Sequence, residues 1–204
     1  MSMDKAHKER MKALEDLKEL SKPLERVIVF IDGGYLRRTF NDLFGDDNID
    51  YGKMLDGLLG LYNSLPSNPF RADLIRAYYY DGIVSEEEDE FRQQKEYFYL
   101  VTNHFFFTLR LGRLIKSSKK KFRQKGVDVL MAIDALTMAY QNHYDTGIFF
   151  MEDRDFIPLI EAVKQAGKKT IVVFYGLKGS DELRRAFDVR IVLDKDSMRP
   201  WHSN

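Results

Sequence analysis

The chain has no cysteine among its 204 residues. This absence excludes disulfide bonds, zinc sites with thiolate ligands and enzymes that use a cysteine nucleophile. It also agrees with a reducing compartment, where disulfides do not persist. Any metal site in this protein must therefore lack thiolate ligands.

The chain also lacks an excess of either charge and any long apolar run. Its 32 Lys and Arg residues balance its 32 Asp and Glu residues, so nucleic-acid binding must depend on a local basic patch. No segment approaches the roughly 18 apolar residues of a membrane span, and the charged N-terminus has no apolar core of the signal-peptide type. We therefore expect a cytoplasmic protein that does not bind membranes.

Missing motifs exclude two enzyme classes and leave a third, the Toprim-type domain, as a distant alternative. The phosphate loop G-x-x-x-x-G-K-[ST] is absent, which excludes a P-loop NTPase. A haloacid-dehalogenase-like phosphatase needs a second aspartate where this chain has Gly34. A Toprim-type domain has a D-x-D pair like Asp153 and Asp155, but it expects glutamate after its first strand, where this chain has Asp32.

Apolar runs that alternate with helical patterns make up most of the chain, and 44% of its residues are hydrophobic. This alternation predicts an α/β fold with βαβ units and a mostly parallel sheet. We expect an amphipathic helix within residues 1–24, one domain over 25–194 and a C-terminal tail over 195–204. The N-terminal helix is expected to pack on the domain or on a second copy of the chain, as a homodimer. The predicted strands are RVIVFIDGG, DLIRAYYYDG, FFFTLRLGRLI, TGIFFMED, KTIVVFYG and VRIVL, and the main helices lie near 51–61, 87–103, 127–142, 155–166 and 180–187.

Two of the predicted strands end in aspartate. In open α/β sheets the ligand crevice lies beyond the carboxyl ends of the strands. Asp32 closes VIVFID and Asp153 closes IFFMED, each before a turn into a helix. Gly33 and Gly34 allow the backbone to approach whatever Asp32 holds. The alternative role for Asp32 is to cap the next helix.

Three further acids lie in or beside predicted helices. Asp134 lies near the middle of VDVLMAIDALTMAY, which is apolar almost all round, so its carboxylate should face a cation, a donor or a water-filled cleft. Asp128 begins the same helix and Asp155 precedes the next one, and both positions suit N-capping as well as a functional site.

These carboxylates require a counter-charge if they converge. Two carboxylates about 4 Å apart repel by roughly 4 kcal/mol at an effective dielectric constant near 20. Protonation or a bound cation relieves this repulsion, and oxygen ligands favour Mg²⁺ or Mn²⁺ over zinc. Such ions activate water and stabilise charge during displacement at phosphorus.

Four segments of the chain, in this order, resemble one protein family: FIDGGYL, KGVDVLMAIDAL, YDTGIFFMEDRDFIPLIEAVKQAGKK and SDELRRAFD. They look like a NYN domain of the LabA or DUF88 type, part of the PIN-like nuclease superfamily, from about Val27 to Leu193. The resemblance implies a Rossmann-like three-layer sandwich whose clustered acids bind divalent metal and cleave RNA. The acids that match the family motifs are the expected catalytic residues Asp32, Asp128, Asp134, Asp153 and Asp155. Of these, we expect Asp32, Asp134 and Asp153 to bind Mg²⁺ or Mn²⁺, and Asp128 and Asp155 to position metal-bound water.

Basic residues near these acids are candidates for binding single-stranded RNA. The run KSSKKKFRQKG, residues 116–126, is either a solvated loop or a phosphate-backbone site. Arg154, with Met151 and Glu152, departs from the Ser and Gly residues usual in the family. Arg154 either contacts a phosphate or neutralises the acids in place of metal, which would leave an inactive RNA- or protein-binding regulatory module. The expected RNA-binding residues are Lys119, Lys120, Lys121, Arg123, Lys125 and Arg154.

Overall fold

The computed structural model describes residues 2–66, 68–116, 122–176 and 181–203 of the chain. Strands from these residues form one seven-stranded sheet in the order β4-β3-β2-β1-β5-β6-β7. Neighbouring strands are parallel except for β3 and β4. The predicted α/β fold with a mostly parallel sheet is confirmed. The strands are β1 (Leu24–Asp32), β2 (Arg71–Ile83), β3 (Phe107–Lys116), β4 (Phe122–Lys125), β5 (Thr146–Phe150), β6 (Lys169–Tyr175) and β7 (Val189–Leu193).

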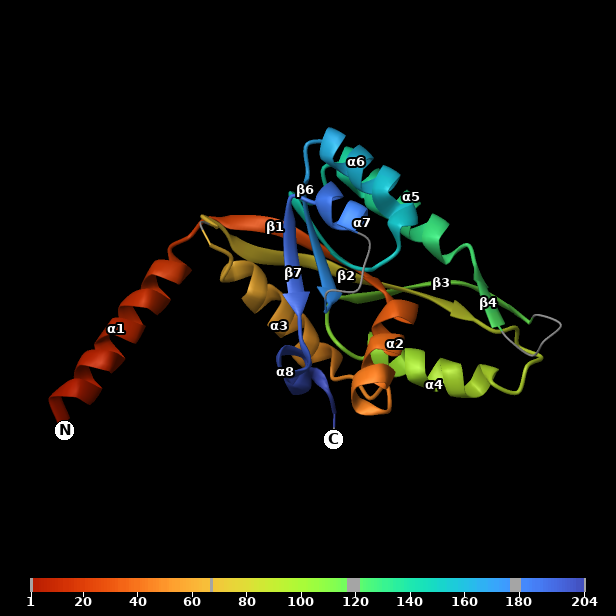
Figure 1. Cartoon of the computed structure of the whole chain (residues 1–204), viewed down its shortest axis with the longest axis horizontal. Helices are drawn as coiled ribbons and strands as arrows, with labels where there is room; N and C mark the ends of the chain where they lie inside the picture. The colour runs from red at the N-terminus through yellow and green to blue at the C-terminus, as the bar shows by residue number, and fades with distance from the viewer. Residues whose placement is uncertain (1, 67, 117–121, 177–180, 204) are drawn as a thin grey trace.

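Helices cover both faces of the sheet and make three layers (Figure 1). α5, α6 and α7 lie on one face, and α2, α3 and α4 lie on the other. The helices are α1 (Ser2–Leu20), α2 (Gly33–Phe44), α3 (Tyr51–Asn63), α4 (Phe91–Thr102), α5 (Val127–Tyr140), α6 (Ile157–Gln165), α7 (Asp181–Ala186) and α8 (Lys195–Met198), with 3-10 turns η1 (Arg154–Phe156) and η2 (Arg199–Trp201).

The aromatic run in β2 shows how the strands build the core on both faces. Successive side chains of a strand point in opposite directions. The Tyr79 hydroxyl therefore lies 2.9 Å from that of Tyr97 in α4, whereas the Tyr80 hydroxyl donates to Asp134 in α5 at 3.1 Å. In β1, no side chain from 27 to 31 is more than 1% exposed, because helices cover this central strand on both sides.

The basic run at 116–126 is only partly a loop. Phe122–Lys125 pairs with Arg113–Lys116 in antiparallel register and forms β4. The sequence did not predict this strand because its residues are mostly charged or polar and carry no apolar alternation. Lys119, Lys120 and Lys121 lie outside the described residues.

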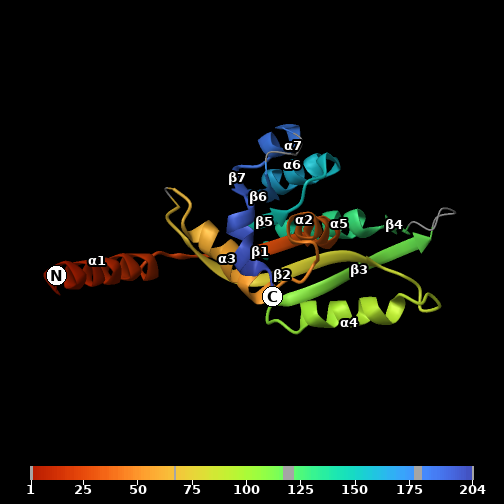
Figure 2. The same ribbon diagram turned by 60° about the horizontal axis from the view of Figure 1, so that its bottom comes forward.

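The two ends of the chain are placed differently. α1 projects away from the rest of the molecule in both views (Figures 1 and 2). The residues expected as a C-terminal tail instead fold onto the body. Trp201 is only 3% exposed and fills the space beside Gly57, where a Cβ would lie 2.3 Å from the indole nitrogen. His202 Nε2 lies 2.8 Å from Asp46 Oδ1.

Every helix in the described part of the chain is too short or too polar to cross a lipid bilayer.

Candidate active site

The strand order places a topological switch point between β1 and β5. From β1, the sheet grows towards β2 and β3 on one side and towards β5, β6 and β7 on the other. Ligands of open parallel sheets bind beyond the carboxyl ends of the strands at such a point. Asp32 ends β1, and Asp153 follows closely after β5. The fold therefore brings these two acids to the same edge.

Asp32 uses one carboxylate oxygen to cap α2. Its Oδ1 accepts a hydrogen bond from the Tyr35 backbone N–H at 3.0 Å, as the capping alternative predicted. Burial raises the pKa of Asp32 to about 6, and the charges of Asp81 and Asp128 add to this rise. The Tyr35 hydrogen bond and the charge of Arg38 oppose it. Asp32 Oδ2 accepts no hydrogen bond from a described residue, so one oxygen is left for a ligand.

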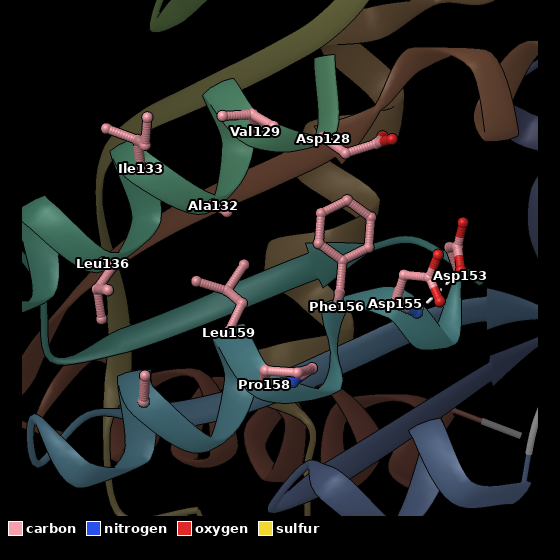
Figure 3. A pocket seen from close by; sticks show the side chains of 11 residues that line it. Asp128, Val129, Ala132, Ile133, Leu136, Asp153, Asp155, Phe156, Pro158 and Leu159 are labelled. Atoms are coloured by element: carbon pink, nitrogen blue, oxygen red, sulfur yellow. Dashed lines mark hydrogen bonds between the residues drawn. The ribbon is translucent and has the colours of Figure 1, made fainter. Parts of the chain in front are cut away.

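Asp128, Asp153 and Asp155 lie at one end of a groove between α5 and α6 (Figure 3). The groove has a volume of about 440 Å³. Asp128 lies in the first turn of α5 but does not cap it, because the N-cap is Gly126 with φ 83°. Asp153 caps η1, and its Oδ1 accepts from the Asp155 N–H at 2.9 Å. The apolar lining residues are Val129, Ala132, Ile133, Leu136, Phe156, Pro158, Leu159 and Ala162.

The carboxylates at this end of the groove act on one another. Desolvation raises the pKa of Asp128, and the charges of Asp153 and Asp155 raise it further. The charge of Asp128 in turn raises the pKa of Asp32. Four of the five predicted aspartates therefore form one electrostatically coupled group.

Asp134, the fifth predicted aspartate, receives its counter-charge from the protein. Arg110 of β3 donates from Nε to Asp134 Oδ2 at 2.7 Å and from Nη2 to Oδ1 at 2.6 Å. Tyr80 donates to Oδ2 as well. The expectation that this buried acid faces a cation or a donor is confirmed. Arginine therefore occupies both of the oxygens that the predicted metal-binding role of Asp134 requires.

Asp81 is a buried acid that the sequence reasoning missed. It ends the apolar part of β2 much as Asp32 ends β1, and this position was the available signal. Arg37 donates from Nε and Nη2 to the two Asp81 oxygens at 3.0 and 2.9 Å, and Gln124 Nε2 donates to Oδ1 at 3.0 Å. Burial raises the pKa of Asp81, while the Arg37 charge and the donors oppose that rise. The hydrogen bond from Gln124 therefore connects the basic strand β4 to Asp81 at the end of β2.

The two glycines after Asp32 make room for neighbouring side chains. A Cβ on Gly33 would lie 2.4 Å from the Tyr79 ring. A Cβ on Gly34 would lie 3.0 Å from Gln124 Nε2 and 3.3 Å from Asp32 Oδ1. The close approach expected at these glycines is therefore made by the protein's own side chains.

A family model for the NYN domain matches residues 26–194. The chain belongs to the NYN domain family. This family is part of the PIN-like nuclease superfamily, so the resemblance of the four sequence segments is confirmed.

Two individual proteins show how far similarity to this NYN domain extends. A solved structure from Vibrio parahaemolyticus, of a protein of unknown function, matches with a TM-score of 0.58 and 19% identity over 84% of this chain and 94% of that chain. At this identity the match shows a shared fold. An uncharacterized protein of Methanocaldococcus jannaschii is 43% identical over 47 residues, which are 23% of this chain and 20% of that relative. The match thus spans about a fifth of the relative's length.

Glu152 and Arg154, two of the three residues that depart from the NYN pattern beside Asp153, lie in different surroundings. Arg154 is exposed and forms no ion pair with any described residue. It does not neutralise the acids in this structure. Glu152 instead lines a hollow with Arg38 and Tyr35, and its charge contributes to raising the pKa of Tyr35 to about 12, a rise caused mainly by burial.

The described residues of the basic run 116–126 lie beside the start of α5. Arg123 and Lys125 are exposed on β4 and line a hollow of about 620 Å³ with Lys116 and Gln124. Lys116 is also paired with Glu88 at 2.5 Å. The hollow adjoins Gly126, which caps the helix that carries the predicted site residue Asp128.

Carboxylate oxygens are the ligands that a hard divalent cation prefers, but the described acids are too far apart to bind one ion together. Over the described ranges, no three Asp, Glu or His side chains stand close enough together to hold one ion. Burial raises the pKa values of Asp32 and Asp128, and the negative charges of neighbouring aspartates raise them further. Asp128 and Asp153 are exposed, so their carboxylates are accessible from solvent.

Proposed function

We propose that this NYN domain hydrolyses phosphodiester bonds in single-stranded RNA with the help of Mg²⁺ or Mn²⁺. The observation that carries this proposal is the coupled group of Asp32, Asp128, Asp153 and Asp155 at the switch point of the sheet. Oxygen ligands of this kind are those that Mg²⁺ and Mn²⁺ prefer. Membership in the PIN-like nuclease superfamily supports the same activity.

The residues of the group have different proposed roles. Asp32, Asp128 and Asp153 would hold the ion, and Asp32 and Asp153 each use one oxygen to cap the helical segment that follows. A bound ion supplies an activated water and offsets negative charge at phosphorus. The proposed role of Asp155, whose backbone N–H donates to Asp153, is to accept a hydrogen bond from the attacking water.

Basic side chains on either side of the acids are the proposed contacts to the RNA backbone. Arg123 and Lys125 lie on the β4 side, and Arg154 lies on the side of β5. Since the chain has no net charge, these local contacts must supply the attraction to phosphate. The predicted contacts of Lys119, Lys120 and Lys121 belong to the same proposal.

A cleavage assay tests the proposed activity. Wild-type protein and the Asp153→Asn variant are incubated with a mixed pool of single-stranded RNA, with Mn²⁺, with Mg²⁺ and with chelator. The Asp73→Asn variant is the matched control, because Asp73 is an exposed aspartate on β2 outside the site. We expect cleavage by wild type and control in either metal, and a loss of at least about 100-fold in Asp153→Asn. Cleavage that continues in chelator would contradict the metal-dependent mechanism.

A second candidate function is an RNA-binding module without catalysis. It is favoured by the observation that no three acidic or histidine side chains of the described residues lie close enough together to bind one ion. RNA binding that weakens with salt, together with no cleavage in Mn²⁺ or Mg²⁺, would support this candidate over the first.

A further inference from the structure

α1 exposes an apolar face that nothing in the described structure covers. Met11, Leu14, Leu17 and Leu20 are 47%, 45%, 62% and 61% exposed, and the helix projects away from the body (Figure 2). Isolated helices are marginal in water because most helical stability in proteins comes from packing of the apolar face. We therefore expect a partner to pack against the apolar face of α1.

The connection from α1 to β1 holds the helix away from its own domain. The Ser21 N–H donates to Leu17 O at 3.0 Å, which continues the helix into the turn. Lys22 Nζ then donates to Asn63 O at 3.4 Å, and the Arg71 N–H donates to Pro23 O at 2.9 Å. In this arrangement no described part of the domain covers the apolar face of α1, which points to a partner from another molecule.

The charges along α1 indicate which molecule this is. In the sequence, residues 8–13 contain three basic side chains and one acidic one, whereas residues 14–20 contain one basic side chain and three acidic ones. This order opposes the preference of an isolated helix, which favours acidic residues at its N-terminus and basic residues at its C-terminus. An antiparallel copy of the same helix reverses the order and places basic half beside acidic half.

We propose that α1 pairs with α1 of a second copy of this chain in an antiparallel arrangement, which makes the protein a homodimer. The apolar face is centred between Leu14 and Leu17, so the antiparallel alignment places Leu14 opposite Leu17 and Met11 opposite Leu20. Arg10, Leu14, Leu17 and Ser21 follow the four-three-four spacing of one helix face. The same alignment places Arg10 opposite Ser21. This pairing is independent of the proposed nuclease activity.

Sedimentation of the full chain tests the pairing. A protein concentration of about 100 μM is needed because one helix pair buries less than the roughly 1,200 Å² of a standard interface. We expect wild type to have twice the 24.0 kDa mass of one chain and the Leu14→Glu/Leu17→Glu variant to have that mass once. Leu100→Glu is the matched control, since Leu100 is a 60% exposed leucine on α4. A monomeric wild type, or a doubled mass that persists in the α1 variant, overturns the proposal. Dissociation by Leu100→Glu alone would move the interface to α4 and overturn it as well.

Cross-linking tests the orientation, and the lack of native cysteine makes the result clear. Arg10→Cys and Ser21→Cys variants are oxidised with oxidised glutathione, separately and as a mixture. Antiparallel pairing predicts a disulfide-linked dimer mainly in the mixture, with at least about a fivefold excess over either variant alone. Efficient linking of each variant to itself would show parallel pairing and overturn the arrangement.

Discussion

Asp32 combines a structural role and a proposed catalytic role in one carboxyl group. One oxygen caps α2, while burial and the charges of Asp81 and Asp128 disfavour ionisation. The sequence predicted both roles as alternatives, because an aspartate between a strand and a helix suits either one. The structure shows that the group has two oxygens and that capping uses only one.

Replacing Asp32 with Asn should stabilise the metal-free protein at neutral pH. The folded pKa of about 6 lies above the usual value near 3.9, so wild type loses stability as pH rises from about 4 to 6 and does not regain it above that range. At about 1.4 kcal/mol per pKa unit, the full effect is at most about 3 kcal/mol. Asn keeps the helix cap and never ionises.

Urea unfolding in chelator at pH 4 and pH 7.5 measures this effect. We expect Asp32→Asn to gain about 1 to 3 kcal/mol relative to wild type between the two pH values, and the Asp73→Asn control to show no comparable gain. An equal difference from wild type at both pH values would mean that burial does not raise the pKa of Asp32.

Arg154 should affect RNA binding rather than metal binding. It is exposed and forms no ion pair within the described part of the chain, so Arg154→Ser removes a cation without freeing an acid. Titration calorimetry should show unchanged Mn²⁺ affinity and RNA binding weakened by roughly 3- to 10-fold, the effect of one phosphate contact at moderate salt. Arg190→Ser, which removes an exposed arginine of β7, is the control. Stronger Mn²⁺ binding by Arg154→Ser would show that Arg154 replaces the metal.

At the scale of the elements, Asp134 differs from the other predicted acids because it is paired with an arginine. This difference depends on the packing of α5 on β3, which carries Arg110. The sequence indicated a buried carboxylate in α5 that needed a partner, but it could not indicate that β3 places Arg110 opposite it. Arg110 lies 24 residues away, and only the packing of α5 on β2 and β3 joins the two. Similarly, β4 was missed because antiparallel pairing with β3, rather than an apolar pattern, defines it.

The Asp134–Arg110 pair should therefore stabilise α5 on the sheet. Asp134→Asn leaves Arg110 with a neutral partner and weakens two charge-assisted hydrogen bonds. Because Arg110 is 41% exposed and keeps some hydration, we expect a loss of about 1 to 2 kcal/mol, which lowers the melting temperature by about 2 to 8 °C. Asp145→Asn, which breaks the more exposed pair with Arg26, should cost less. A higher melting temperature for Asp134→Asn in chelator would mean that repulsion from the other carboxylates outweighs the pairing with Arg110, so that Asp134 belongs to the acidic site.

At the scale of the whole molecule, the site exists only when the fold is complete. Asp32 and Asp153 are far apart in sequence and reach the same edge of the sheet because β1 and β5 are neighbours at the switch point. The sequence predicted the acids at the ends of β1 and β5 and a mostly parallel sheet. It could not predict the strand order, because apolar runs covered on both faces look alike wherever they lie in a parallel sheet.

A metal ion that binds this assembled site should stabilise the entire chain. Binding to the folded state alone adds about 2.7 kcal/mol at an ion concentration 100 times the dissociation constant. For a chain of this length, that gain raises the melting temperature by roughly 5 to 11 °C. Thermal melts with saturating Mn²⁺ or with chelator should show this rise for wild type and for Asp73→Asn, and a much smaller one for Asp153→Asn. An equal rise in all three proteins would place the ion away from Asp153. No rise in any of them up to millimolar Mn²⁺ would favour the RNA-binding module, because a nuclease of the proposed kind must hold its ion in the folded state.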